Sequence, residues 1–198
     1  MRTNFNILIV LGFCFSLCFT VNAQVKGDYD YVYTSIAAAQ KNPDWVYHLN
    51  LSKKRLQELP QELSEFPNLI TLDLSNNKIS LLPAAIGELK NLEELNLSKN
   101  DFSVIPPQIG KLKKLRELDL SKNNIRALPA ELGQLKQLIT LDLWQNEIKQ
   151  ISEGLAGLES LKDLNLRGNT LDDSLEEKLK KWLPTTNLYF SSSCRCGF

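Results

Sequence analysis

Apolar residues recur along the middle of the chain with a period of 23 residues, and this period predicts a repeat fold. Each unit follows the pattern LxxLxLxxNxL. The units lie at 46–56, which is degenerate, and at 69–79, 92–102, 115–125, 138–148 and 161–171. After four of them the chain continues as LPAAIGEL, IPPQIGKL, LPAELGQL and ISEGLAGL. We therefore expect every unit to form the same local structure.

The last two leucines of LxxLxL lie on one face of a short strand, because side chains alternate along a strand. Such a strand buries only half of its surface, so one unit cannot close a core, whereas stacked units pair their strands in parallel. Each fully buried leucine is worth roughly 1.5–3 kcal/mol. The expected aliphatic column is Leu72, Leu95, Leu118, Leu141 and Leu164.

One asparagine per unit follows the strand, where the chain must turn inward. An amide can donate to and accept from backbone groups that the turn leaves unpaired, so we expect a ladder of amides from unit to unit. The ladder comprises Asn77, Asn100, Asn123, Asn146 and Asn169. A following proline fixes φ and starts a helical turn on the outer side. Gly87, Gly110 and Gly133 stand where this outer segment must approach its neighbours.

These motifs resemble the leucine-rich repeat family, in the 23-residue subtype with LPxxIGxL that occurs in bacterial proteins and in plant intracellular Ras-group relatives. The resemblance covers residues 46–171, or about six units. It implies an α/β fold: a right-handed leucine-rich-repeat solenoid with a parallel concave sheet, convex short helices or turns, and helical caps at both ends. It also implies that the concave sheet binds a protein. Two positions depart from the pattern, since Lys54 replaces the first asparagine and Ser152 replaces a proline.

Both ends of a solenoid need a cover, because the core would otherwise meet water. Residues 24–45 predict an N-terminal cap, in which Thr34 or Ser35 starts a short helix that Pro43 stops. Residues 172–190 predict a C-terminal cap, with an amphipathic helix that runs through Trp182 and a last strand at 187–190. A cysteine-containing tail follows at 191–198.

The N-terminus has the pattern of a secretory signal: Arg2, an apolar run from Ile7 to Phe19, and small residues before a cleavage site after Ala23. The run of thirteen residues is shorter than the roughly 20 that a membrane-spanning helix needs. We therefore expect residues 1–23 to be removed and the mature chain to be secreted, periplasmic or at the cell surface, with no stable membrane span. An uncleaved membrane anchor is the alternative.

Charge and site chemistry argue against several classes of protein. The chain has 23 basic and 23 acidic residues, whereas a nucleic-acid binder needs a basic excess. His48 is the single histidine, and no nucleophile motif, phosphate loop or paired CxxC occurs, so we predict no enzyme, no cofactor and no metal site. Cys194 and Cys196 remain after signal removal. They can be idle, form a strained disulfide with each other, or link two chains into a dimer.

Residues that point away from the core form two columns along the strands. One column is Asn50, Asp73, Asn96, Asp119, Asp142 and Asn165; the other is His48, Thr71, Glu94, Glu117, Thr140 and Asp163. Like charges on strands roughly 4.8 Å apart repel each other. This acidic strip is either a solvated face screened by Lys53, Lys99 and Lys122, or a docking strip for a basic partner segment. Single spaced carboxylates do not supply the six or more oxygens of a calcium site.

Trp144 interrupts a column of serines on the same face. Arg167 lies one strand away, close enough to stack on the indole, so the two residues either satisfy each other or form a binding hot spot. We predict an exported, non-enzymatic module that binds a protein or peptide on this face. The alternatives are a glycan-binding or cell-surface adhesion protein that uses the same face, and a scaffold without a ligand. The predicted contact residues are Glu117, Asp119, Thr140, Asp142, Trp144 and Arg167.

Overall fold

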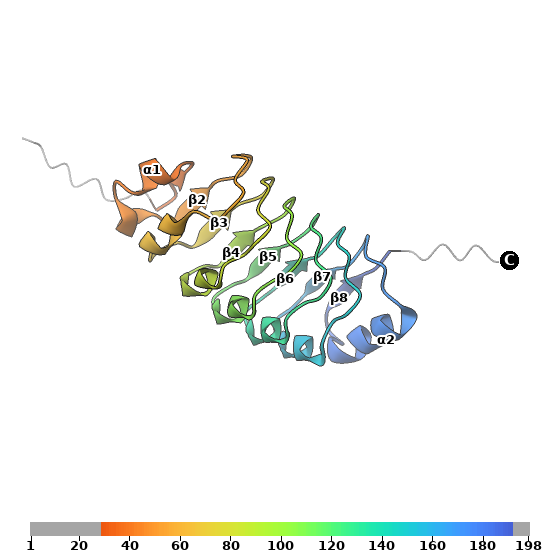
Figure 1. Ribbon diagram of the computed structural model, residues 1–198. Helices are drawn as coiled ribbons and strands as arrows, with labels where there is room; N and C mark the ends of the chain where they lie inside the picture. The colour runs from red at the N-terminus through yellow and green to blue at the C-terminus, as the bar shows by residue number, and fades with distance from the viewer. Residues whose placement is uncertain (1–28, 192–198) are drawn as a thin grey trace, which may run out of the picture.

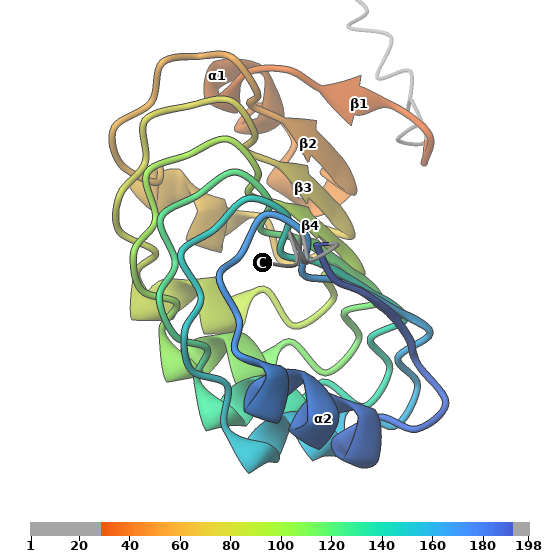
Figure 2. The same cartoon turned by 90° about the vertical axis from the view of Figure 1, so that its right-hand side faces the viewer.

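The structure, a computed structural model, describes residues 29–191 (Figure 1). The predicted secretory signal, Cys194 and Cys196 lie outside the described residues. Successive repeat units stack into an elongated solenoid with strands along one side and short helices along the other (Figure 1, Figure 2). The predicted fold, a parallel sheet with convex short helices and a helix at each end, is confirmed.

Eight strands form one parallel sheet in sequence order. Between β2 and β7, pairing places each residue opposite the one in the next unit, so Leu72, Leu95 and Leu118 lie side by side and buried. The predicted leucine column is thus confirmed. The strands are β1 (Val32–Tyr33), β2 (His48–Asn50), β3 (Thr71–Asp73), β4 (Glu94–Asn96), β5 (Glu117–Asp119), β6 (Thr140–Asp142), β7 (Asp163–Asn165) and β8 (Asn187–Tyr189).

A short 3-10 helix forms the convex side of each of the first five units. Pro83, Pro106 and Pro129 precede three of these helices, with φ between −71° and −68°, the range that the proline ring imposes. Ser152 holds the same place with φ −80° and ψ 156°, so loss of the proline leaves the outer turn unchanged. The helices are η2 (Gln61–Glu65), η3 (Ala84–Glu88), η4 (Pro107–Lys111), η5 (Ala130–Gln134) and η6 (Glu153–Gly157).

Glycine allows the convex helices to stack closely. A Cβ atom on Gly110 would overlap the backbone of Glu131, and one on Gly133 would overlap the carbonyl group of Gly154. Both neighbours are backbone atoms, which cannot move aside as a flexible side chain can. The close approach predicted at these glycines is confirmed.

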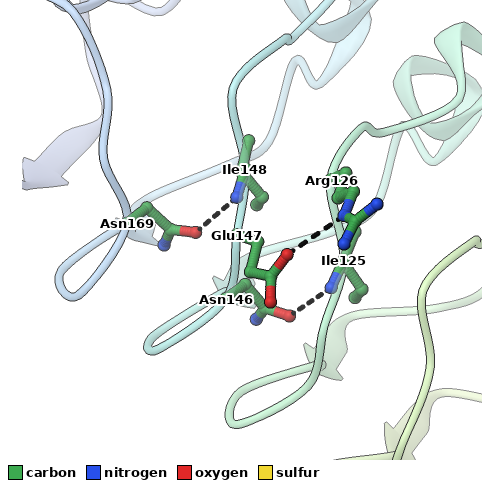
Figure 3. Close-up of polar contacts among 6 residues, drawn as sticks. All are labelled: Ile125, Arg126, Asn146, Glu147, Ile148 and Asn169. Atoms are coloured by element: carbon green, nitrogen blue, oxygen red, sulfur yellow. Dashed lines mark hydrogen bonds and ion pairs between the residues drawn. The ribbon is translucent and has the colours of Figure 1, made fainter.

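The asparagine ladder supplies the hydrogen bonds of the turns. The amide nitrogen of Asn146 donates to the carbonyl oxygens of Leu120, in the preceding unit, and Leu143, in its own, at 3.0 and 3.1 Å. Its Oδ1 accepts from the backbone N–H of Ile125 at 3.1 Å. Figure 3 shows this rung and the next one. The same arrangement, with every amide buried, recurs at Asn77, Asn100, Asn123 and Asn169.

The residue before each asparagine position has a left-handed backbone, with φ between 53° and 76°. Only Gly168 is a glycine at this position, so the other units adopt a conformation that side chains disfavour. The turn was predicted from the sequence, but its left-handed backbone was not. The non-glycine residues are Lys53, Asn76, Lys99, Lys122 and Gln145.

The N-terminal end is covered by α1 (Ile36–Ala39), followed by η1 (Pro43–Trp45). The Ser35 hydroxyl accepts from the N–H of Ala38, as expected for a helix cap. The sequence did not predict β1, which precedes α1 and pairs with β2. Two residues are too few to show the alternation by which a strand is recognised.

The C-terminal end is covered by α2 (Asp173–Trp182), which packs against η6. The Asp172 carboxylate accepts from the N–H of Leu175 at 2.7 Å and so caps the helix. Leu175 and Leu179 are buried against the last repeat, and β8 follows as the final strand. The helix and strand predicted here are both present.

Candidate functional site

The strand register confirms the two columns on the solvent side of the sheet, which we call the concave face. Glu117 and Thr140 lie side by side in one column, and Asp119 and Asp142 lie side by side in the other. The structure thus brings these four predicted contact residues together on β5 and β6. The other two follow β6 and β7: Trp144 and Arg167.

The column that contains Asp119 and Asp142, which we call the central column, has a structural role that was not predicted. Asp119 Oδ1 accepts from the backbone N–H of Ser121, and Asp142 Oδ1 accepts from that of Trp144, both at 2.8 Å. These bonds close the turn that follows each strand. Asparagine at the same position does this with its amide oxygen, as at Asn50, Asn96 and Asn165. An aspartate in this column is therefore not by itself a sign of binding.

A hollow of about 430 Å³ lies on the concave face and extends from β1 to β5. Four carboxylates line it: Asp73, Glu94, Glu117 and Asp119. The other four predicted contact residues, on β6 and beyond, are not part of its lining. The predicted site is therefore divided between this hollow and a second surface.

Direct ion pairs do not neutralise the carboxylates of the hollow within residues 29–191. The ion pairs of the described residues lie outside the hollow. Glu88 pairs with Lys90 and Lys111, Arg126 pairs with Glu147, and Lys136 pairs with Glu159. Lys122, one of the three lysines considered as a screen for the strip, lies over the ring of Trp144. The side chains of Glu94 and Glu117 are exposed and have no hydrogen bond to any described residue.

Trp144 is half-buried in the turn after β6, and Lys122 lies over its ring, with Nζ 4.6 Å from the centroid. The predicted stacking of Arg167 on Trp144 is wrong. The Arg167 Cζ lies 5.8 Å from the ring centroid of Tyr189 instead. A 3.0 Å hydrogen bond from Arg167 Nε to Asn165 Oδ1 holds the guanidinium on that side.

Tyr189, on β8, was missed by the sequence reasoning, although its place opposite Asn165 puts it in the central column. Its hydroxyl donates to Asp163 Oδ1 at 3.0 Å. This hydrogen bond, together with the negative charge of the same carboxylate, raises the pKa of Tyr189 above its ordinary value of about 10. We name the second surface the cation–aromatic row and define it as Lys122, Trp144, Arg167 and Tyr189.

Carboxylates near the cation–aromatic row are bound by neighbouring side chains, in contrast to Glu94 and Glu117 in the hollow. The Asn165 amide donates to both oxygens of Asp142, at 3.1 and 3.2 Å. Asp163 Oδ1 also accepts from the amide of Asn187 at 3.1 Å. Thr140 lies between Glu117 and Asp163 in its column and is half-buried. The two halves of the concave face therefore differ in free negative charge.

An apolar edge borders the hollow beside β1. Tyr29, Tyr31 and Val32 are 55%, 54% and 48% exposed, and Val32 lines the hollow itself. The Tyr29 ring packs on Tyr47 with centroids 4.8 Å apart and meets His48 edge-on at 5.7 Å. Val32 thus places exposed apolar surface directly beside the carboxylates of the hollow.

Among residues 29–191, no cluster of histidine, cysteine, aspartate or glutamate side chains is arranged to hold a metal ion. None of the helices in that range has the length and apolar character needed to span a bilayer.

Comparisons with known proteins give a consistent result. A family model described as leucine rich repeat matches residues 46–102 and 113–171, and a model for two copies of such repeats matches 90–133. A search of curated proteins found no match.

Three solved structures illustrate the similarity. A leucine-rich-repeat protein of Leptospira interrogans is 33% identical over 82% of this chain and 47% of its own, with a TM-score of 0.65. The ectodomain of the Arabidopsis thaliana receptor kinase GASSHO1/SCHENGEN3, in complex with CASPARIAN STRIP INTEGRITY FACTOR 2, is 35% identical over 67% of this chain and 16% of its own, at 0.55. The plant peptide hormone receptor RGFR1, in complex with RGF2, is 26% identical over 75% of this chain and 28% of its own, at 0.59. The chain thus spans less than half the length of each.

Proposed function

Because the chain belongs to the leucine-rich repeat family, we propose that it is an exported, non-enzymatic module that binds a protein or peptide partner on its concave face. The partner contacts the predicted residues on β5, β6 and the turns after β6 and β7. These residues are Glu117, Asp119, Thr140, Asp142, Trp144 and Arg167.

The observation that carries this proposal is the open concave face. It presents free carboxylates at Glu94 and Glu117, and it presents a half-buried tryptophan where four other units have serine. Tryptophan and arginine are enriched at the energetic centres of protein interfaces, and charge complementarity gives such interfaces their specificity. No requirement of the fold explains Trp144, since serine stands at the same position in four other units.

Two of the similar structures support the class of partner, because each is a plant receptor determined in complex with CASPARIAN STRIP INTEGRITY FACTOR 2 or RGF2. Export rests on the signal pattern at 1–23. N-terminal sequencing of the secreted protein should start at Gln24. A larger product that retains residue 1 would support the membrane-anchored alternative.

Replacing Trp144 with serine tests the binding site. The partner recovered by capture on the full chain should bind Trp144→Ser at least about tenfold more weakly, as for an interface hot spot. The free energy of unfolding should stay within about 1 kcal/mol, because serine fits this position in other units. Val104→Ser, which removes an exposed apolar side chain outside the strands, is the control and should leave binding unchanged.

Three outcomes would argue against parts of the proposal. Unchanged binding by Trp144→Ser would remove the concave contact centre, and a collapse in stability would make Trp144 structural. A sugar ligand on a glycan array, lost in the same variant, would favour the glycan-binding alternative. For the tail, a dimer on a non-reducing gel that disappears in Cys194→Ser/Cys196→Ser would support linkage of two chains.

A further inference from the structure

We propose that the hollow between β1 and β5 receives an extended, basic segment of the partner protein, with an apolar residue at its β1 end. The inference rests on the proposed function and adds the partner's chemistry and its position. It also moves the main contact away from Trp144, toward the first half of the sheet.

The dimensions of the hollow suit a short extended segment. Its lining comes from five neighbouring strands, β1 to β5. Strands lie about 4.8 Å apart, so the lining spans roughly 19 Å, which about six extended residues cross at 3.3 Å each. A segment that crosses the strands in this way reaches all four carboxylates that line the hollow.

Charge defines the kind of segment. Glu94 and Glu117 are directly paired across β4 and β5, an arrangement of like charges that destabilises a sheet. Neither side chain has an ion pair or hydrogen bond to a described residue, and Asp119 lies on the same strand as Glu117. Lysine or arginine side chains placed over these carboxylates would replace the repulsion between them with attraction to the partner, and would speed association.

The two ends of the hollow differ and so fix the direction of the segment. At the β1 end, Val32 is 48% exposed and lines the hollow, so it offers apolar surface that a leucine or similar side chain can cover. At the β5 end, the ammonium group of Lys122 lies over Trp144. Beyond it, the carboxylates of Asp142 and Asp163 are already bound by neighbouring side chains, so a basic segment gains little there and stops before the cation–aromatic row.

A direct test uses a defined peptide instead of the unknown partner. The probe is a fluorescein-labelled peptide of alternating lysine and threonine that ends in leucine, and its fluorescence anisotropy is measured with the purified full chain. Glu94→Gln/Glu117→Gln should weaken binding at least about tenfold at low salt, since attraction between close charges is largest there. The variant should remain folded, because glutamine is nearly isosteric and these side chains have no bond to lose.

The matched control is Glu153→Gln/Glu177→Gln, which removes the same charge from exposed positions on η6 and α2. It should change the affinity less than about twofold, because these carboxylates lie on η6 and α2, away from the strands that line the hollow, and Coulomb attraction falls with distance. Equal loss in both double variants would overturn the proposal, since it would show attraction to net charge alone. No loss in Glu94→Gln/Glu117→Gln would also overturn it.

The direction of the segment has its own readout. Val32→Thr should weaken the leucine-ended peptide and leave a peptide of lysine and threonine alone unaffected; equal effects would overturn the assignment of the apolar end. The captured partner separates this proposal from the proposed function. A partner that is lost with Trp144→Ser but retained with Glu94→Gln/Glu117→Gln leaves concave binding standing and refutes the basic segment. A partner insensitive to both refutes concave binding itself.

Discussion

The buried asparagine ladder and the open columns of the concave face are both polar, yet they vary very differently from unit to unit. In the ladder, nitrogen and oxygen of each amide are both bonded to backbone, and five units carry asparagine. In the central column only an oxygen is needed, and aspartate or asparagine occurs. In the other column, which begins at His48, equivalent positions hold Glu94, Glu117 and Thr140. Residue type thus varies most at positions whose side chains make no hydrogen bond that the fold needs, and at these positions a unit can become specific for a binding partner.

The largest effect should come from the ladder. Asn123→Leu keeps the number and branching of the side-chain heavy atoms but removes the acceptor for the N–H of Phe102 and the donor to the carbonyl oxygen of Leu97. Each buried group left unpaired costs about 1–3 kcal/mol, so we expect a loss of at least about 3 kcal/mol in chemical denaturation. Asn124→Leu, at the exposed neighbouring residue, should cost less than about 0.5 kcal/mol. Similar losses in both variants would contradict the role of the ladder.

The central column should show a smaller effect that depends on the replacement. Asp119→Ala removes the acceptor for the N–H of Ser121 and should cost about 1 kcal/mol. Asp119→Asn keeps an oxygen at that place, as Asn96 does on the strand before it, and should stay within about 0.5 kcal/mol of the original chain. Equal destabilisation by the two variants would mean that the charge, and not the turn, requires aspartate.

The smallest effect concerns protonation at the far end of the sheet. The raised pKa of Tyr189 means that the fold favours its neutral hydroxyl, because that group donates to Asp163 and lies near its charge. The stabilisation is complete below the ordinary pKa of about 10 and is lost as the pH rises through the higher folded value. Asp163→Asn should lower the Tyr189 pKa in an ultraviolet titration. Tyr189→Phe identifies its signal, and an unchanged curve in Asp163→Asn would rule out this coupling.

Positions set by the repeat were predictable, because one pattern occurs several times in the sequence. Leucine columns, amide rungs and close glycines all recur at a fixed spacing, and α2 shows its own helical periodicity. The surface was harder to predict. The partner of Arg167 comes from the cap, where Tyr189 has no repeat to align it, and the use of Asp119 in a turn depends on backbone geometry. The hollow depends on β1, which is too short to have a pattern.

The hydrogen bonds of the ladder all run in one direction along the array of units. The oxygen of each asparagine serves the unit before it: Asn146 accepts from Ile125, and Asn169 accepts from Ile148. The first unit has no full repeat before it, and there Lys54 replaces asparagine without leaving a rung unserved. Duplication of an internal unit would also duplicate the asparagine whose oxygen accepts from the unit before it. Deletion of the last unit would leave a backbone N–H of the preceding unit without its acceptor. Such an array can therefore lengthen by duplication of an internal unit, whereas a second copy of the first unit would bring Lys54 and leave the unit before it without an acceptor.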